Sequence, residues 1–545
     1  MKQNKYFKSS AIITNCVSVC IMTLLVLTSC LGDLDRFPEN ETTGEDVYST
    51  FDGYKGAIVK VYASNALSGN QGPAGKPDIS GLDEGQYADF LRMYFNHQEL
   101  PTDEAQCIWQ DEGIPGLNNL NFSSENPFTK GMYNRCIMNI MYANEFLRNA
   151  ASDVVGGKGF SGAQVDEIKN FCAEARFLRA FQYWVLMDLF GNPPFVTEET
   201  ELDVLPSQIN RQQLFAYIEK ELKDITDNNL LKEARTNEYG RADKGAAWAL
   251  LARLYLNAEV YTGTGRYNEA ATYSEKVINA GYALKNSYEQ LFLANNNVNN
   301  PEVILSINYD GERTRNYGGA TFLINCGSNN DYQAKYADVL LNYGMRDNAN
   351  WSGYRARKEF TDKFAAGDKR FLFVGDNPSI SNYVDYKEGL ATYKWRNITI
   401  DAQGKWAYGS HITYADNDFP LFRLAEMYLT YAEAVKRGGN GSTANALDYI
   451  NRLRVRAFGN ADNNYRNFND VTLEHILNER GCELYWEAHR RTDLIRFNRF
   501  TGSNYIWEWK GGIRNGRSVS SHYNLYPIPS SDLTANPNLK QNPNY

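Results

Sequence analysis

Two carboxylates spaced one residue apart are the first feature of the sequence that could support chemistry. Asp416 and Asp418 stand in a polar segment before a predicted helix. Oxygen ligands at this spacing can hold calcium, and the asparagines at 295–297 could add further oxygens. Alternatively, the two acids are solvated and cap the helix that follows. The sequence therefore offers a calcium site at this loop as one of two interpretations, and it requires no other cofactor.

The amino-terminal segment predicts a covalent modification. Three lysines precede an apolar run over about residues 11–27, and small residues stand directly before Cys30. A basic start, an apolar stretch and small residues at the cut are typical of a secretory signal, and a cysteine at the cut is typical of bacterial lipoproteins. A signal anchor that spans the membrane is the alternative, but the run is short for that. We expect a signal peptide over residues 1–29 and a lipid on Cys30, which would anchor the body to one membrane face.

The sequence lacks the common motifs of enzymes. It has five histidines and no His-x3-His, Cys-x2-Cys or His-Glu-x2-His spacing, which argues against zinc or transition-metal catalysis. No Gly-x-Ser-x-Gly, P-loop or dinucleotide fingerprint occurs. A glycosidase needs two carboxylates facing each other across a cleft, and a chain with 65 acidic residues cannot be excluded by counting. Glu479, Glu483 and Glu487 have the spacing of a helical ladder and predict a salt-bridged face with Arg480 and Arg490. We expect a binding protein that is not an enzyme, with a glycoside hydrolase as the alternative.

Charge and size narrow the class of partner. The 545 residues carry a formal net charge of −9, and removal of a leader with three lysines and no acid would leave −12. An acidic body argues against nucleic acid as a partner, because phosphates need a basic surface. The hydrophobic share of 43% is ordinary for a globular protein and is enough for a large core.

The elements that must position any site are predicted to be mainly helices. Residues 167–190 carry apolar side chains three or four positions apart and end at a Gly-Asn-Pro-Pro stop. Residues 241–281 and 421–458 each contain two such stripes around a glycine-rich break, with small alanines opposite bulky aromatics. This pattern is typical of tetratricopeptide-like helical pairs, which stack into a solenoid. We predict a mainly α fold, with helical pairs over about 130–290 and 420–500.

Two long segments lack these stripes. Residues 68–120 and 296–420 are rich in Asn, Asp, Gly and Tyr, apart from a β-like run at 302–307. Long irregular segments on a rigid scaffold usually carry function. We therefore expect one body over residues 30–545, in which these two loop-rich regions bind the ligand.

Landmarks along almost the whole chain resemble the SusD-like (RagB/SusD) family. They are Leu34-Asp35-Arg36 after the lipobox, residues 174–180, 188–194 and 419–427, residues 479–480 with 489–496, and residues 526–529. The resemblance implies a tetratricopeptide-like helical scaffold capped by a loop-rich half. It also implies a lipid-anchored protein exposed on the outer membrane of a Gram-negative cell. Such a protein would form a lid over a TonB-dependent, SusC-like transporter and bind oligosaccharides for import.

The loop-rich regions further resemble the starch-binding members of this family. By that resemblance, Trp109, Tyr317 and Trp351 form an arc that stacks on an α-glucan, while Arg92 and Asp83 contact sugar hydroxyls. The residue types suit this role, because the apolar face of a pyranose stacks on an electron-rich ring and a guanidinium can bridge adjacent oxygens. Composition alone does not single out Trp109 among the nine tryptophans.

Two departures from the starch-binding pattern leave the identity of the glycan open. The stretch at Glu112 and Gly113 is one residue shorter and lacks an asparagine that holds the sugar, and Gln106 and Cys107 stand where a second tryptophan is expected. We expect capture of starch or malto-oligosaccharides for the transporter. The alternatives are a non-starch glucan, another oligosaccharide, or a peptide-capturing lid. A peptide groove would need strand-like edges or apolar pockets.

Overall fold

The computed structural model describes residues 44–73, 75–82, 87–337, 342–401 and 403–545. The predicted signal peptide, Cys30 and Asp83 lie outside these residues. Residues 44–54 form one compact unit and residues 55–545 form another, and the second unit carries the features described below. Within the described residues, no helix combines the length and the apolar character needed to cross a membrane.

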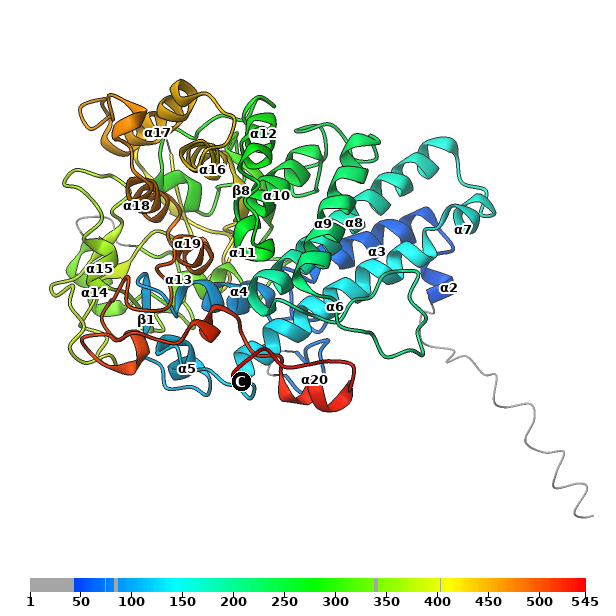
Figure 1. The fold of residues 1–545 in the computed structure, drawn as a ribbon, viewed down its shortest axis with the longest axis horizontal. Coiled ribbons are helices and arrows are strands. Elements are labelled where there is room, and N and C mark those ends of the chain that lie inside the picture. Colours follow the sequence, from blue (N-terminus) through cyan, green and yellow to red (C-terminus); the bar gives the residue numbers. More distant parts are fainter. Residues whose placement is uncertain (1–43, 74, 83–86, 338–341, 402) are drawn as a thin grey trace, which may run out of the picture. The chain divides into compact units, whose positions relative to one another are not determined.

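Helices dominate the described chain, as the sequence predicts (Figure 1). The longer helices are α3 (Phe51–Ala63), α4 (Phe90–Glu99), α6 (Pro127–Asn149), α8 (Gly162–Phe190), α9 (Arg211–Asp227), α10 (Lys244–Leu256), α12 (Tyr267–Ile278), α16 (Leu424–Lys436), α17 (Thr443–Phe458) and α18 (Leu473–Leu484). The short ones are α2 (Gly44–Val47), α5 (Ile114–Asn118), α7 (Ser152–Gly156), α11 (Ala258–Thr262), α13 (Ala320–Asn325), α14 (Asn330–Lys335), α15 (Lys358–Thr361), α19 (Arg490–Arg496) and α20 (Ser530–Ala535), and the 3-10 turns are η1 (Glu289–Phe292), η3 (Phe468–Asp470), η4 (Lys510–Gly512) and η5 (Ser521–Asn524).

The helices stack in the order expected of a tetratricopeptide-like scaffold. α8 packs against both α6 and α9, α10 packs against α12, and α12 packs against α16, which in turn contacts α17 and α18 (Figure 1). The long helix α8 starts where Ser161 and Gln164 form a capping box, and it stops at Gly191, whose φ of 77° few other residues adopt without strain. The predicted end of this helix is confirmed.

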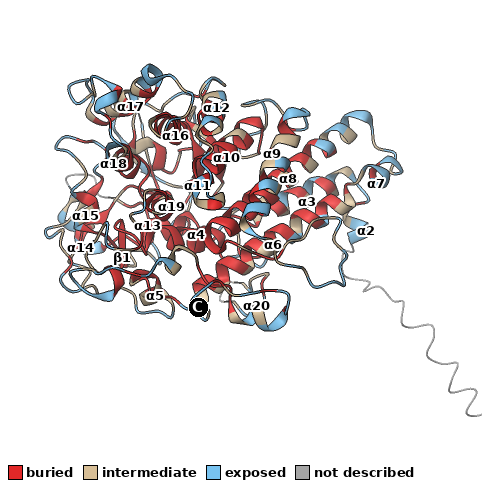
Figure 2. Ribbon diagram, viewed as in Figure 1, coloured by how far each residue is buried: buried red, intermediate tan, exposed pale blue. Residues whose placement is uncertain are grey.

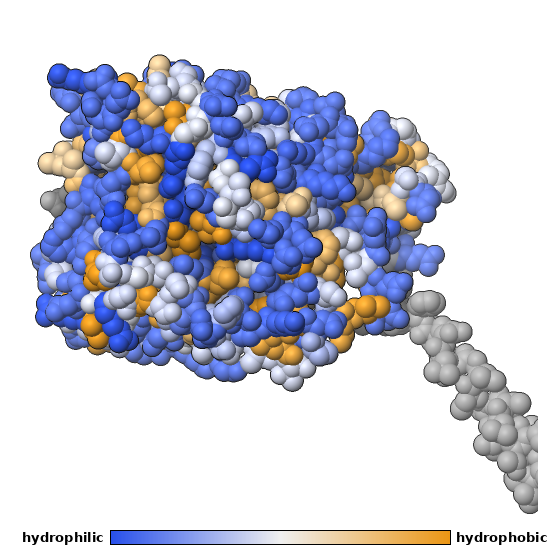
Figure 3. All heavy atoms as spheres, viewed as in Figure 1, coloured by the Kyte–Doolittle hydropathy of each residue, from blue (hydrophilic) through white to orange (hydrophobic). Residues whose placement is uncertain are grey.

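The sequence patterns do not predict helix α4. The region 68–120, expected to be irregular, contains α4, and all ten of its residues are buried. Five of these ten buried residues, Arg92 and residues 96–99, are polar or charged, so the composition of the segment does not mark it as part of the core. Buried residues also fill the sides on which the neighbouring helices meet (Figure 2). The surface in this view is mostly hydrophilic, with scattered apolar side chains (Figure 3).

The loop-rich regions contain short antiparallel pairs of strands, some local and some between distant segments. Among the described residues the pairs are β1 (Ala105–Cys107) with β3 (Tyr354–Ala356), β2 (Val303–Ile307) with β8 (Phe419–Arg423), β4 (Phe373–Val374) with β5 (Ala391–Thr392), and β6 (Ile398–Ile400) with β7 (Trp406–Tyr408). The β1–β3 pair ties the region around residue 105 to the region around residue 355. This pairing positions the candidate site.

Candidate functional site

Trp109 and Trp351 lie together beside the β1–β3 pair. Trp109 follows β1 by two residues, Trp351 precedes β3 by three, and the register sets Cys107 opposite Tyr354. The two ring centroids are 6.4 Å apart at 50°, and the indole N–H of Trp109 donates to the Trp351 carbonyl at 3.2 Å. Both side chains are half-buried. The two rings, called the tryptophan pair below, therefore form one partly exposed aromatic surface.

The surroundings hold the tryptophan pair in place. The ring of Tyr354 meets Trp109 edge-on at 5.4 Å, and the indole N–H of Trp351 donates to the Asn348 carbonyl at 2.8 Å. A Cβ at Gly353 would lie 2.3 Å from the Trp109 ring, so this close approach requires glycine. Ser352 has a φ of 53°, a conformation that costs a non-glycine residue free energy and is common at functional sites. Both indole N–H groups are thus satisfied by backbone, and the rings are fixed before any ligand arrives.

Arg92 lies behind the tryptophan pair, on α4. Its guanidinium carbon is 5.8 Å from the centre of the Trp109 ring and 4.9 Å from that of Phe322. The residue is only 6% exposed. The position fits a cation–π contact that supports the platform from inside. Direct contact between Arg92 and a sugar stays a prediction.

Tyr317 lies at the other end of α13 from Trp351. α13 begins three residues after Tyr317, and its last residue, Asn325, accepts hydrogen bonds from the backbone N–H groups of Trp351 at 3.0 Å and, through its side chain, of Asn350 at 3.1 Å. Six helical residues span about 9 Å. The half-buried ring of Tyr317 packs on Tyr414 at 5.2 Å, and within the described chain neither tryptophan is among its ring neighbours. The structure thus joins two members of the predicted arc directly and relates the third to them through a short helix.

The carboxylates of Asp416 and Asp418 accept hydrogen bonds from neighbouring segments. Buried Asp418 accepts from the backbone N–H of Tyr309 and the hydroxyl of Tyr239, both at 2.8 Å, and burial raises its pKa to about 7. Asp416 accepts from Ser410 and Gly311. The loop leads into β8, not directly into a helix, so the helix-capping interpretation is wrong.

The carboxylate oxygens of Asp416 and Asp418 do not fit a calcium site. A carboxylate whose oxygens already accept hydrogen bonds is committed to those donors, and a raised pKa opposes the charged form that calcium needs. The expected asparagine does meet the loop, but Asn296 exchanges hydrogen bonds of 2.8 and 3.0 Å with the Asp418 backbone. Across the part of the chain that the structure describes, no three His, Cys, Asp or Glu side chains gather as metal ligands.

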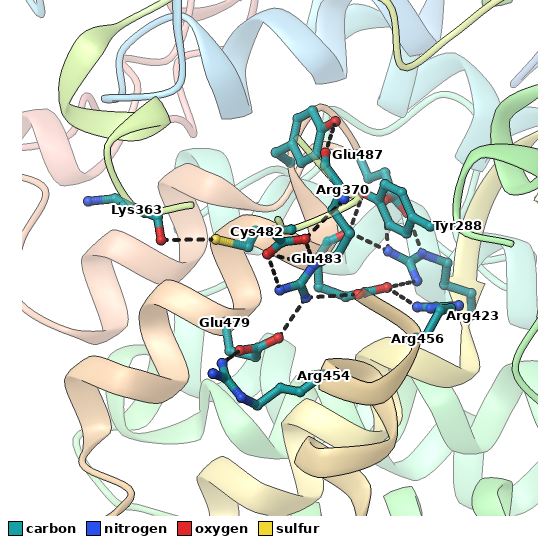
Figure 4. Close-up of polar contacts among 12 residues, drawn as sticks. Tyr288, Lys363, Arg370, Arg423, Arg454, Arg456, Glu479, Cys482, Glu483 and Glu487 are labelled. Atoms are coloured by element: carbon teal, nitrogen blue, oxygen red, sulfur yellow. Dashed lines mark hydrogen bonds and ion pairs between the residues drawn. The ribbon is translucent and has the colours of Figure 1, made fainter. Parts of the chain in front are cut away.

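All three glutamates of the predicted ladder are buried, not on a solvated helix face. Glu479 and Glu483 lie on α18, but the helix ends at Leu484, so the prediction of a helical ladder is wrong for Glu487 (Figure 4). The partners of the ladder are not the expected Arg480 and Arg490, which pair with Asp493 and Asp103. The ladder is instead neutralised by four other arginines. They are Arg370 and Arg454 on Glu479, Arg370, Arg423 and Arg456 on Glu483, and Arg423 on Glu487.

These carboxylates are unsuited to acid catalysis. Burial alone would raise the pKa of Glu483, but the guanidinium groups of Arg456, Arg423 and Arg370 lower it to about 2. A general acid needs a raised pKa and an open cleft. The ladder therefore holds the scaffold together and does not mark an active site.

Two cavities of about 250 and 200 Å³ flank the loop at 239–241, and neither tryptophan lines them. The tryptophan pair itself presents two half-buried rings, which suits binding one face of a long ligand.

Comparison with known proteins identifies the family of the chain. Residues 301–545 match the model of the SusD family, and residues 103–256 match a model described as starch-binding and associating with the outer membrane. The chain is 38% identical to the starch-binding protein SusD of Bacteroides thetaiotaomicron, over 95% of this chain and 96% of that one. It is 25% identical to a SusD-like protein of Bacteroides ovatus, over 97% and 92% of the two chains.

Solved structures share the fold. A SusD superfamily protein of Parabacteroides distasonis has a TM-score of 0.69 at 22% identity, covering 91% of this chain and 99% of that one. Surface glycan-binding protein A of Bacteroides thetaiotaomicron, solved with laminarihexaose, has a TM-score of 0.66 at 18% identity, covering 90% and 99%. Together with the family models and the curated relatives, they lead to one assignment. The chain belongs to the SusD (RagB/SusD) family, and it is a noncatalytic, glycan-binding protein.

Proposed function

We propose that the protein captures starch or malto-oligosaccharides on the tryptophan pair and passes them to a TonB-dependent, SusC-like transporter. A lipid on Cys30 would anchor it to the outer membrane, with the body on the cell surface. The observation that carries the proposal is the pair itself, two half-buried indoles whose polar N–H groups are already bonded to backbone. The 38% identical relative that is named a starch-binding protein supports the choice of glycan.

The energetics of such a platform suit capture followed by release. Each stacked ring contributes about 0.5–1.5 kcal/mol beyond the area that it buries. Two or three rings with a few hydrogen bonds would give about 4–8 kcal/mol of binding free energy, which corresponds to millimolar to micromolar affinity. A ligand held at this strength can still be handed on.

Affinity electrophoresis tests the glycan directly. Native gels would contain amylopectin, mixed-linkage β-glucan, xyloglucan or levan, with Trp351→Ala beside the wild type. We expect retardation of the wild type in amylopectin alone, and loss of it in the variant. Leu202→Ala, at a residue 81% exposed on another loop, is the matched surface control. Retardation only in a different gel would refute starch, and a platform role would be refuted if Trp351→Ala were retarded like the wild type.

A non-starch glucan is the second candidate, for a specific reason. The shortened stretch at Glu112 and Gly113 lies just beyond Trp109, and Glu112 is exposed there. An acid in place of an amide can accept but not donate a hydrogen bond when ionised. The hydroxyl pattern read at this end of the platform would then differ from that of starch, and the same gels separate the two candidates.

A further inference from the structure

A second group of exposed rings lies on the β6–β7 hairpin. Trp406 and Tyr408 stand two residues apart on β7, so their side chains share one face of the strand. Their ring centroids are 5.0 Å apart at 82°. Tyr408 is 42% exposed and Trp406 is half-buried. Aromatic side chains that are this exposed to solvent are available to contact a ligand.

Arg346 completes the group with hydrogen-bond donors. Its guanidinium carbon is 4.3 Å from the centre of the Tyr408 ring, and the residue is exposed. Among the described residues, this guanidinium makes no ion pair and no hydrogen bond, so its fork is open to hydroxyl oxygens. A ring beside an open guanidinium combines the two kinds of contact that a pyranose needs.

The group is continuous with the tryptophan pair along the backbone. The N–H groups of Arg346 and Asp347 donate to the Ile412 carbonyl at 2.9 and 3.2 Å, and Asn348 accepts the indole N–H of Trp351 at 2.8 Å. Even a fully extended chain would separate residues 346 and 351 by at most about 18 Å. Left-handed φ angles at Asn348 and Asn350 turn the chain and shorten that span. A single oligosaccharide is long enough to bridge it.

We propose that Trp406, Tyr408 and Arg346 form a second saccharide platform, the hairpin platform, which binds a remote pyranose of the same glycan chain that lies on the tryptophan pair. The inference rests on the proposed function, because it takes the tryptophan pair as the primary site. A second contact on one ligand acts at high effective concentration, so even a weak platform strengthens binding of long chains. Short oligosaccharides reach only one platform and gain nothing.

The test compares long and short ligands. Wild type, Trp406→Ala/Tyr408→Ala, Arg346→Ala, Trp351→Ala and the control Leu202→Ala would be run in the polysaccharide gel that retards the wild type, and titrated calorimetrically with the matching trisaccharide. We expect the hairpin double variant to bind the polysaccharide about three- to tenfold more weakly with an unchanged trisaccharide Kd. Arg346→Ala should shift in the same direction, and Trp351→Ala should lose both ligands.

The outcomes separate the two claims. Wild-type polysaccharide affinity in the hairpin double variant, beside loss in Trp351→Ala, would overturn the hairpin platform and leave the primary site standing. An equal loss of both ligands in the double variant would also overturn it, since the hairpin would then belong to the primary site. If no polysaccharide retards the wild type, the proposed function fails and the hairpin platform fails with it. Near-ultraviolet circular dichroism on each variant confirms that the fold is intact.

Discussion

At the scale of single residues, the platform depends on one missing side chain. Gly353 lets the backbone of β3 approach the face of Trp109, and Gly353→Ala would place a methyl group 2.3 Å from that ring. We expect the ring to be displaced, with glycan affinity at least about tenfold weaker and a loss of stability of about 1–3 kcal/mol. Gel retardation and urea unfolding measure the two effects.

Gly162→Ala is the matched control, because a Cβ at this first residue of α8 meets nothing within 4 Å. It should bind and unfold like the wild type. Normal retardation of Gly353→Ala would show that the Trp109 ring is free to move without loss of the ligand, and would contradict the rigid platform.

Two buried carboxyls near the platform predict a dependence of stability on pH. Glu99 and Glu104 lie inside the protein, between α4 and β1, where they accept hydrogen bonds from the N–H groups of His489 and Trp486. Burial and the neighbouring charge of Glu99 raise the pKa of Glu104 well above its ordinary value. Above the ordinary carboxyl pKa the native state therefore keeps a proton that the unfolded chain releases, so the free energy of unfolding falls as the pH rises.

Glu104→Gln removes the ionisable group and keeps its shape. We expect the variant to gain stability relative to the wild type on going from pH 5 to pH 8, measured by urea unfolding at both values. Glu433→Gln should instead be less stable than the wild type at pH 8. Arg496 and its neighbours lower the pKa of Glu433 in spite of burial, so the charged carboxylate stabilises the fold. A Glu104→Gln variant that loses more stability at pH 8 than at pH 5 would show that Glu104 is ionised in the native state.

At the scale of elements, one arginine joins strand β8 to α18 and to the segment that follows it. Arg423 pairs with Glu302 at 2.9 Å, Glu483 at 2.7 Å and Glu487 at 2.6 Å, all of them buried. Arg423→Met would remove one buried counter-charge from all three carboxylates, although Arg456 still pairs with Glu302 and Glu483, and Lys394 still pairs with Glu487. We expect a loss of about 3–5 kcal/mol in the free energy of unfolding.

A surface pair provides the control for that loss. Arg452 and Asp448 form an ion pair on α17 in which both side chains are about half exposed, 55% and 52%. Arg452→Met should change stability by less than about 1 kcal/mol. Similar small losses in both variants, measured by chemical unfolding, would mean that the buried ladder is not electrostatically essential to the scaffold.

The same scale shows why sequence patterns succeeded for some elements and failed for others. α12 and α17 have an exposed side, and α10 and α16 are almost wholly buried, yet in all four the apolar and alanine residues at helical spacing predict a helix. α4 is only ten residues long and half of them are polar, so the sequence does not predict it. The acids at 416 and 418 looked like helix caps because nothing in their spacing announces the intervening strand β8.

At the scale of the whole molecule, only the resemblance to a family could single out the site. Trp109 and Trp351 are 242 positions apart, and no periodicity relates them. In the hairpin platform, two aromatic residues stand two positions apart, which is the spacing of side chains on one face of a strand. Whether those side chains are exposed depends on the tertiary structure and cannot be predicted from that spacing. Likewise, the burial of Glu479, Glu483 and Glu487 follows from the arginines that other elements bring to them.

The β1–β3 pair has a consequence for the order in which the protein folds. Because one indole of the tryptophan pair comes from the first quarter of the chain and the other from the second half, the pair forms only when β3 joins β1 and closes a very long loop. Contacts of such high sequence separation form slowly. The ability to hold sugar would then form late in folding, after the early helices have packed, and a chain truncated before β3 would lack the tryptophan pair.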